Sequence, residues 1–265
     1  MLKDARARII HKESWKHYHL LSIETSPIAR EAQPGQFLMV RVDSLPYPLL
    51  RRPFSIHARD KDTVHIFFAE AGVGTAILAG KGAGDSLDIL GPLGKGFAVE
   101  KSLKGKTVFL AGGGRGIAPL YFLAQELRNR DIQPKLFYGG RTASDLPLLP
   151  KFEAAGFSIL ASTDNGSLGF KGFVSSLLKE ELERLQPAHI YACGPEPMMK
   201  TIAACADTRN IPAQFSLEAI MGCGIGACWG CVRRIKRGDK AEWVKTCEDG
   251  PVFRSSEIVW QGEDS

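Results

Sequence analysis

The sequence lacks three features that would place it in a special class of protein. No apolar run approaches the roughly 18 residues that a membrane-spanning helix needs. The first residues, MLKDARARIIHKE, contain no apolar segment like that of a secretory signal. No internal repeat or low-complexity tract is present. We therefore expect a cytoplasmic protein made of ordinary folded domains, whose cysteines are either reduced or bound to a metal.

The net charge is small, and this bears on whether the protein binds nucleic acid. The formal net charge of the 265 residues is +5, and no dense block of lysine and arginine alternates with aromatic residues. This argues against nucleic acid as a partner. Hydrophobic residues make up 44% and charged residues 24% of the chain, which is typical of a globular protein. The length allows two domains, or two domains and a small appendage.

The sequence does contain a group of closely spaced cysteines near its end. Four of the six cysteines follow one another with gaps of four, two and fifteen residues: Cys223, Cys228, Cys231 and Cys247. Glycines between the first three allow a tight loop, so the four thiolates can converge. The C-x4-C-x2-C…C spacing is that of plant-type [2Fe–2S] proteins and differs from that of a zinc ribbon. We predict an iron–sulfur cluster here; a structural zinc ion is the alternative.

Residues 1–100 are predicted to form a small antiparallel β-barrel. Six short β-rich runs alternate with turn signals such as Gln33-Pro34-Gly35 and Ala83-Gly84-Asp85. The six expected strands are residues 7–10, 18–23, 36–42, 54–58, 63–68 and 86–90. Residues 91–97, GPLGKGF, follow the last of them and are expected to form a loop.

Two segments of this region have the residue types that a nucleotide needs. Arg52-Pro53-Phe54-Ser55 offers a cation, a flat face and a hydroxyl, which suit a phosphate, a ring and a ring nitrogen. A plain strand start with a solvated arginine is the alternative. Gly72-Val73-Gly74-Thr75 precedes a helical turn, whose first backbone N–H groups favour an anion such as pyrophosphate. Alone, this second signal is weak because Gly-x-Gly turns are common.

Residues 101–213 alternate strands with helices, which predicts a parallel, doubly wound sheet. The strand at residues 106–111 leads into Gly112-Gly113-Gly114-Arg115-Gly116 and then into a helix at residues 117–127. This resembles a nucleotide-binding crossover, although Ile117 stands where a third glycine would be, so a purely structural turn remains possible. Further strands are expected at residues 134–138, 157–161 and 189–192, and further helices at residues 173–185 and 198–206.

The chemically unusual residues of this region follow its strands, at the sheet edge where ligands bind. Gly114 and Gly116 follow the first strand, and Cys193 and Gly194 follow a later one. Cys193 is either a buried thiol or part of a nicotinamide site. Asp164 would accept hydrogen bonds from a ribose and repel a 2′-phosphate, which favours NADH over NADPH. The alternative is that Asp164 belongs to a simple turn. Cys205, within a helix, is expected to act as a small hydrophobic residue.

These motifs, taken in order, resemble those of ferredoxin-reductase-like proteins. The motifs are RPFS at 52–55, Gly74-Thr75, GRGIAP at 114–119 and CGP at 193–195. Further motifs narrow the choice of family within this group. They are the cysteine stretch, PGQF at 34–37, LLRRPFSI at 49–56, STDNGSLGFKGFV at 162–174 and DGPVF at 249–253. With them, the whole chain resembles the electron-transfer subunit of class 1B dihydroorotate dehydrogenase.

The resemblance implies three domains and a set of contacts. These are an FAD-binding barrel at 1–100, an NAD-binding α/β domain at 101–213 and a [2Fe–2S] domain at 214–265. It implies that residues 52–55 hold the flavin, that Phe67, Phe68 and Ala69 flank it, and that Gly74 and Thr75 contact its pyrophosphate. Family members often carry an arginine at the position of Ala69, so another group or the backbone must meet the phosphate charge. Arg115 also departs from the small or apolar residue that is usual there.

The resemblance also implies a function in pyrimidine (UMP) biosynthesis. NADH carries two electrons as a hydride, an iron–sulfur cluster takes one, and a flavin exchanges one or two, so the flavin belongs between them. Ser55 would position or tune the flavin N5, and no residue is predicted to act as an acid or base. The partner would be an FMN-containing dihydroorotate dehydrogenase catalytic subunit, in a heterotetramer with two copies of each chain, and electrons would flow towards NAD⁺. The alternatives are a subunit of a hydrogenase or sulfite reductase complex, or a stand-alone NADH reductase.

Residues next to the cysteines have two interpretations each. Trp229 lies either in the core or on a surface that a partner covers. Arg233, Arg234, Lys236 and Arg237 are expected to be the solvated side chains of a hairpin, although they could offset cluster charge or steer a partner.

Overall fold

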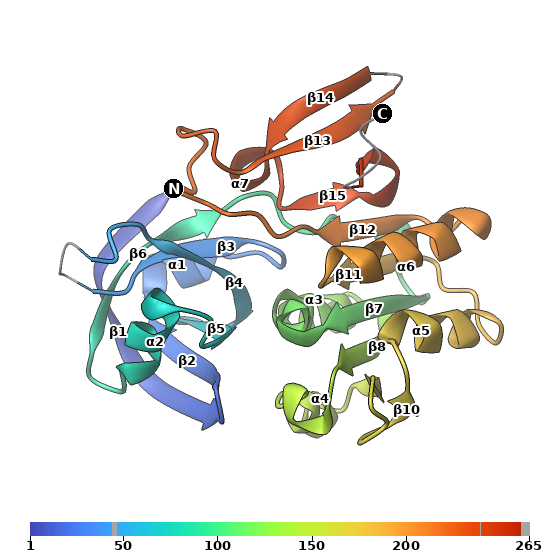
Figure 1. The fold of residues 1–265 in the computed structure, drawn as a ribbon, viewed down its shortest axis with the longest axis horizontal. Helices are drawn as coiled ribbons and strands as arrows, with labels where there is room; N and C mark the ends of the chain where they lie inside the picture. The colour runs from blue at the N-terminus through green and yellow to red at the C-terminus, as the bar shows by residue number, and fades with distance from the viewer. Residues whose placement is uncertain (44–46, 239, 261–265) are drawn as a thin grey trace. The chain divides into compact units, whose positions relative to one another are not determined.

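The computed structural model describes residues 1–43, 47–238 and 240–260 (Figure 1). The chain forms two compact units. The first comprises Met1–Gly96, Glu218–Arg233 and Lys245–Pro251. The second comprises Phe97–Leu217, Arg234–Val244 and the described residues from Val252 on. A compact unit need not be a domain that folds by itself. The three domains expected at 1–100, 101–213 and 214–265 therefore remain a prediction.

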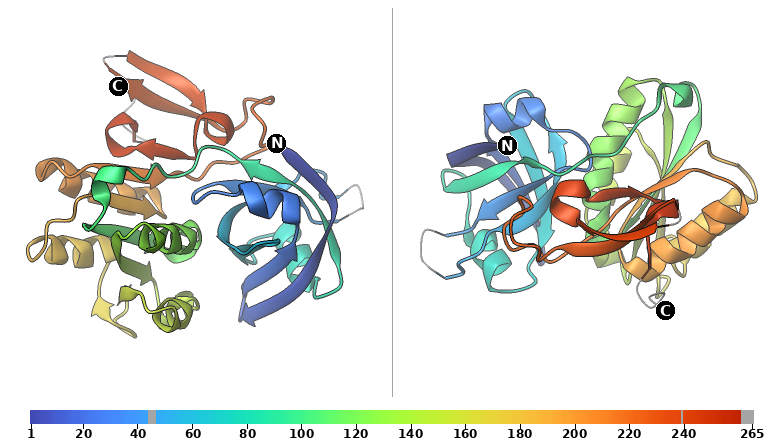
Figure 2. Two further views of the ribbon diagram at one scale, coloured as in Figure 1. Left: turned by 180° about the vertical axis from the view of Figure 1, so that it is seen from behind. Right: turned by 90° about the horizontal axis from the view of Figure 1, so that it is seen from above.

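A closed, six-stranded antiparallel barrel makes up most of the first unit, as predicted (Figure 2). Two short helices accompany it, α1 (Ser26–Glu31) and α2 (Val73–Gly80). In order around the barrel, the strands are β1 (Leu2–Trp15), β2 (Tyr18–Glu24), β5 (Thr63–Ala69), β4 (Arg52–Arg59), β3 (Phe37–Arg41) and β6 (Ser86–Leu93). Closure pairs every strand on both sides, which leaves no open edge.

β1 and β6 extend beyond the ranges that the sequence pattern predicts. β1 covers Leu2–Trp15 because its first half pairs with β6 and its second half with β2, with a register shift in each pairing. Its charged residues hide this from a pattern search, which finds only residues 7–10. The expected loop at 91–97 is also partly wrong, since β6 continues to Leu93, where it pairs with Phe37.

The second unit is built on a seven-stranded sheet. Figure 1 shows α3 (Ala118–Asn129) and α4 (Leu149–Ala154) on one face of this sheet, and α5 (Val174–Leu182) and α6 (Glu196–Thr208) on the other. In order across the sheet, the strands are β10 (Phe170–Lys171), β9 (Ser158–Thr163), β8 (Gln133–Gly140), β7 (Thr107–Gly113), β11 (Ile190–Cys193), β12 (Ala213–Ser216) and β15 (Val252–Arg254). All neighbours are parallel except β12 and β15.

The strand order confirms the predicted doubly wound sheet and places its switch point. From β7 the chain moves outward through β8 and β9, then crosses back to β11 on the other side of β7. The turns that follow β7 and β11 are therefore neighbours, which is where such sheets bind ligands. The helix after β7 begins at Ala118 rather than Ile117, because Gly114–Ile117 form a 3-10 turn. The strands β10, β12 and β15 were not expected from the sequence.

A two-stranded hairpin precedes the last cysteine. It consists of β13 (Val232–Arg237) and β14 (Lys240–Lys245), and the short helix α7 (Thr246–Asp249) follows it. Lys236 and Arg237 are exposed, as a solvated hairpin requires, whereas Arg233 and Arg234 are half-buried.

One buried histidine makes the second unit sensitive to acid. His189 precedes β11, and its Nε2 lies 3.2 Å from Nε2 of Gln214, whose amide also donates to the Ala98 carbonyl at 2.9 Å. His189 therefore accepts a hydrogen bond in its neutral form. Burial lowers the pKa of His189 to about 4 from 6.5. The unfolded chain takes up this proton at a higher pH, so the folded state loses stability as the pH falls from about 6.5 towards 4.

We expect this histidine to contribute about 1.5 kcal/mol to the loss of unfolding free energy between pH 6.5 and pH 5. His189→Phe should flatten the dependence, because it removes the titrating group and keeps a ring against Tyr191. The measurement is denaturant unfolding at both pH values. His11→Phe, which replaces an exposed histidine of β1, should keep the full dependence. If the unfolding free energy of His189→Phe changed with pH as much as that of the wild type, His189 would not be the group responsible.

Candidate cofactor and cluster sites

The cysteine stretch folds against the barrel within the first unit. Buried Cys231 and Cys247 share one apolar cluster with Phe37, Met39 and other barrel residues. Gly224 has a φ of +72°, and a Cβ there would lie 2.4 Å from Cγ of Met39. Glycine is therefore required for the loop to approach the barrel this closely.

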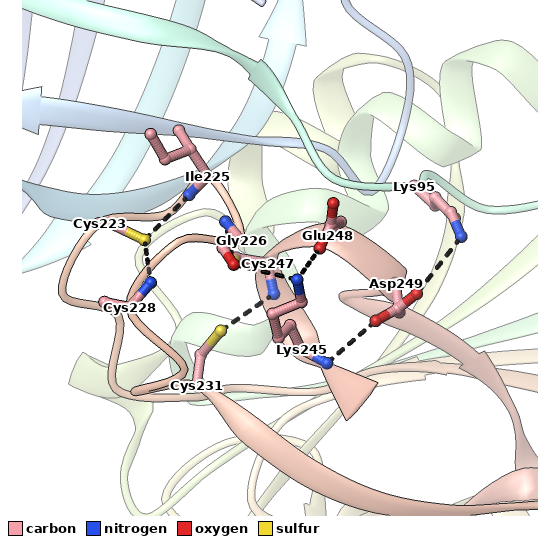
Figure 3. Close-up of polar contacts among 10 residues, drawn as sticks. All are labelled: Lys95, Cys223, Ile225, Gly226, Cys228, Cys231, Lys245, Cys247, Glu248 and Asp249. Atoms are coloured by element: carbon pink, nitrogen blue, oxygen red, sulfur yellow. Dashed lines mark hydrogen bonds and ion pairs between the residues drawn. The ribbon is translucent and has the colours of Figure 1, made fainter. Parts of the chain in front are cut away.

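The first two cysteines form one pair (Figure 3). The backbone N–H groups of Ile225 and Cys228 donate to the sulfur of Cys223, at 3.5 and 3.4 Å. The N–H of Gly230 donates to the sulfur of Cys228 at 3.4 Å. Backbone donors directed at sulfur favour the thiolate, which is the form that binds metal.

The last two cysteines form a second pair, although the hairpin separates them in sequence. The N–H of Cys247 donates to the sulfur of Cys231 at 3.4 Å, and the N–H of Gly226 donates to the sulfur of Cys247 at 3.2 Å. The N–H of Thr246 also donates to the carbonyl of Cys231 at 3.0 Å, which ties α7 to the loop. Each of the four sulfurs therefore accepts a backbone hydrogen bond.

One cysteine in each pair has a shifted pKa, and the two shifts have opposite directions. Burial opposes ionisation of Cys223, but the N–H donors of Ile225 and Cys228 outweigh it and lower the pKa of this thiol to about 7. Burial, reinforced by the neighbouring Cys231 thiol, raises the pKa of Cys247 to about 12. Binding of a metal by Cys247 must therefore displace a proton that burial holds in place.

The donor set fits a two-iron cluster. All six cysteines are free, so no disulfide competes for them. A [2Fe–2S] cluster has two irons and takes two thiolates on each. The two hydrogen-bonded pairs of cysteines match this requirement.

The loop also exposes apolar side chains. Ile220 is 90% exposed and Trp229 is 57% exposed, so the core interpretation of Trp229 is wrong. Ile225 and Val232 are exposed as well. These four exposed apolar side chains lie within thirteen residues of sequence, from Ile220 to Val232 at the start of β13, which is typical of a surface that another protein covers.

The predicted flavin residues meet at one end of the barrel. Arg52 begins β4, and a Cβ on Gly74 would lie 2.8 Å from its Nε, so the guanidinium lies directly over the first turn of α2. A cation and free backbone N–H groups at a helix start both attract phosphate. Arg52 is thus placed to supply the charge that an arginine at Ala69 would otherwise provide.

The remaining flavin residues have different environments. The Thr75 hydroxyl accepts from the N–H groups of Ala71 and Gly72, at 2.8 and 3.1 Å, so it shapes the turn before α2. Pro53 and Ser55 of β4 are half-buried. The other members of the set are buried side chains of β4 and β5: Phe54, Phe67, Phe68 and Ala69.

Four of the predicted nicotinamide-nucleotide residues meet at the switch point of the sheet. A Cβ on Gly116 would lie 2.2 Å from the carbonyl oxygen of Cys193 and 2.6 Å from Cα of Gly194. The turns after β7 and β11 are therefore in direct backbone contact. Gly114, in the same turn, has a φ of +53° and open space around it. Cys193 is buried, with 4% exposure.

Asp164 lies at the other end of this sheet edge. It is exposed just after β9, and its N–H donates to the carbonyl of Gly140 at 3.1 Å. Three strand steps separate β9 from β11, which corresponds to roughly 14 Å at the usual strand spacing. Cys193 and Asp164 therefore lie on the same edge of the sheet, at opposite ends of this span.

Sequence reasoning missed two residues at the cluster site. Lys245, the last residue of β14, and Glu248 of α7 form an ion pair beside Cys247. The sequence signal for this ion pair is the three-residue spacing of Lys245 and Glu248 around Cys247. Their contacts with Gly226 and Trp229 could not be predicted, because those residues are distant in sequence.

Two family models match the chain. Residues 218–259 match the iron–sulfur cluster binding domain of dihydroorotate dehydrogenase B. Residues 110–204 match an oxidoreductase NAD-binding domain. The first match covers all four paired cysteines, and the second covers the switch point of the sheet.

Curated relatives align along almost the whole chain. The dihydroorotate dehydrogenase B (NAD⁺) electron transfer subunit of Desulforamulus reducens is 38% identical over 260 residues, which is 97% of this chain and 98% of that protein. The protein of the same name from Bacillus caldolyticus is 39% identical over 259 residues, which is 96% of each chain.

Solved structures share the fold. A structure of an NADH-dependent reduced ferredoxin-NADP oxidoreductase, described for flavin-based electron bifurcation, has a TM-score of 0.84 and 29% identity, covering 97% of this chain and 91% of that one. A ferredoxin NADP⁺ reductase from Neisseria gonorrhoeae, with bound FAD and NADP, has a TM-score of 0.62 and 21% identity, covering 78% of this chain and 91% of that one.

A closed barrel, a doubly wound sheet and a paired-cysteine loop define an oxidoreductase of the ferredoxin-reductase-like class. Within that class, the chain belongs to the family of electron transfer subunits of dihydroorotate dehydrogenase B (NAD⁺). The resemblance inferred from the sequence motifs is therefore confirmed.

We expect the purified protein to contain iron and acid-labile sulfide, and Cys228→Ser to lose most of both, because one iron would lose a thiolate. Metal analysis and the electron paramagnetic resonance signal of the reduced protein are the measurements. Cys205→Ser, which changes a cysteine of α6, should retain both. A wild-type protein that contains zinc and no iron would contradict the cluster.

Proposed function

We propose that this chain passes electrons between NAD(H), FAD and a [2Fe–2S] cluster, to or from the FMN of a dihydroorotate dehydrogenase catalytic subunit in pyrimidine (UMP) biosynthesis. The observation that carries this proposal is the pairing of four thiols in a loop packed on the barrel, in a chain that aligns end to end with subunits of that name. When bound, the nicotinamide supplies a hydride, the flavin exchanges one or two electrons, and the cluster exchanges one.

For FAD, we propose the set found at one end of the barrel. Arg52 and the first turn of α2 at Gly74 hold the pyrophosphate, and Thr75 keeps that turn in shape. Pro53, Phe54 and Ser55 border the ring along β4. The buried side chains of Phe67, Phe68 and Ala69 form its supporting wall. Water is excluded on this side because the wall is apolar.

For NAD(H), we propose the sheet edge of the second unit. Gly114, which has open space around it, lets the backbone approach the pyrophosphate, and Gly116 lets this turn pack against Cys193 and Gly194. Cys193 and Gly194 border the nicotinamide, and Asp164 accepts hydrogen bonds from the adenosine ribose. No side chain is required as an acid or base, so this chain's task is to bind and orient.

The cluster is proposed to be held by Cys223 and Cys228 on one iron and by Cys231 and Cys247 on the other. This assignment follows the two hydrogen-bonded pairs. The cluster would belong to a [2Fe–2S] domain at 214–265, beside an FAD domain at 1–100 and an NAD domain at 101–213.

The partner is proposed to be the FMN-containing catalytic subunit, in a heterotetramer with two copies of each chain. Family membership favours this partner over a hydrogenase or sulfite reductase. Exposed Ile220 and Trp229 beside the cysteines support a covered face, which a stand-alone reductase would not need. In the described part of the chain, no helix is long and apolar enough to cross a membrane, and we propose that the complex works in the cytoplasm.

Ile220→Glu should weaken binding to the catalytic subunit by about tenfold or more, because a charge in the middle of an apolar interface must be desolvated. The measurement is the dissociation constant of the purified subunits. Ile10→Glu, on an exposed position of β1, is the matched control and should bind normally. If both variants bind like wild type, the proposed contact surface is wrong.

Asp164 should make NADH the preferred nucleotide. We expect Asp164→Asn to reduce the preference for NADH over NADPH by roughly tenfold, because it removes repulsion of the 2′-phosphate. The measurement is kcat/KM for both nucleotides with ferricyanide as acceptor. Asp131→Asn, at another exposed acid of the same unit, should leave the preference unchanged. Faster oxidation of NADPH by wild type would defeat the assignment.

A further inference from the structure

Lys245 connects three parts of the cysteine loop. Its Nζ donates to the carbonyl oxygen of Gly226 at 3.0 Å and forms an ion pair with Glu248 (Figure 3). The same Nζ lies 5.1 Å from the centroid of the Trp229 ring. Only 20% of the Lys245 side chain as a whole is exposed.

Gly226 links this lysine to a cluster ligand. Its carbonyl oxygen accepts from Lys245, while its N–H donates to the sulfur of Cys247 at 3.2 Å. Gly226 has a φ of +82°, and a Cβ there would lie 2.6 Å from Oε2 of Glu248. The ion pair is therefore packed directly against Gly226, the residue whose N–H bonds the sulfur.

Two lysines lie near the carboxylates of Glu248 and Asp249, and the side chain of Lys245 is less exposed than that of Lys95. Asp249 accepts from the Lys245 backbone N–H at 3.0 Å, and its other oxygen lies 3.9 Å from Nζ of Lys95. The Lys95 side chain is 65% exposed, so water and salt screen it. Glu248, the residue after Cys247, has 53% of its side chain exposed and pairs with Lys245.

We propose that Lys245 and Glu248 are positioning residues that set the reduction potential of the cluster held by the four cysteines. This inference rests on the proposed function, because it requires that cluster. Reduction adds a negative charge, so a nearby ammonium favours it and a nearby carboxylate opposes it. Lys245 raises the potential and Glu248 lowers it, while together they hold the Gly226 N–H on the sulfur of Cys247.

The test is a redox titration of the holoprotein, followed by electron paramagnetic resonance of the cluster. Lys245→Met should shift the midpoint potential downward, and Glu248→Gln should shift it upward. The double variant should return towards wild type, and Lys245→Arg should stay near wild type because it keeps the charge. Opposite signs for the two single variants are the expected signature, which a purely structural role does not produce.

Lys61→Met, at an exposed lysine of the turn between β4 and β5, is the charge-matched control and should leave the potential unchanged. Shifts of the same sign in both single variants, or none beyond that of Lys61→Met, would overturn the inference. If Lys245→Met does not retain iron, Glu248→Gln decides alone, and an unchanged potential there overturns it. A wild-type protein without iron overturns the proposed function itself, which distinguishes the two failures.

Discussion

The structure depends on the close packing of the cysteine loop against the barrel. Gly224 meets Met39, and buried Cys231 and Cys247 complete an apolar cluster that begins on β3. A loop this rich in glycine has little tendency to order itself, because each glycine loses much conformational freedom on folding. Contact with the barrel supplies the burial that orders the loop, and only then can its backbone N–H groups point at sulfur.

A second constraint organises the sheet of the other unit. The backbones after β7 and β11 touch at Gly116 and Cys193 because the strand order reverses between them. This reversal opens an edge where a dinucleotide can lie across neighbouring strands. Both units therefore use glycine for the same purpose, which is to let two segments that are far apart in the sequence pack closer than a Cβ would allow.

Much of this could be predicted from local pattern. The spacing of the four cysteines, the strand–glycine–helix turn at Gly114 and the alternation of strands and helices all concern neighbours in sequence. Features that depend on distant pairing were missed or shortened. β1 is one example, since charged residues obscure a strand whose two halves pair with different partners. The contact of the Lys245–Glu248 ion pair with Gly226 is another, since Gly226 lies nineteen residues before Lys245 in the sequence.

The amino-acid sequence by itself determined the family, the two fold classes and the identity of the cysteine set, because each is written in residue types at short, regular spacing. The tertiary structure decided which cysteines pair, that Arg52 lies over the start of α2, and that Trp229 is exposed. These properties depend on contacts between segments far apart in the chain. Their energies come from burial and hydrogen bonds that exist only after the chain has folded.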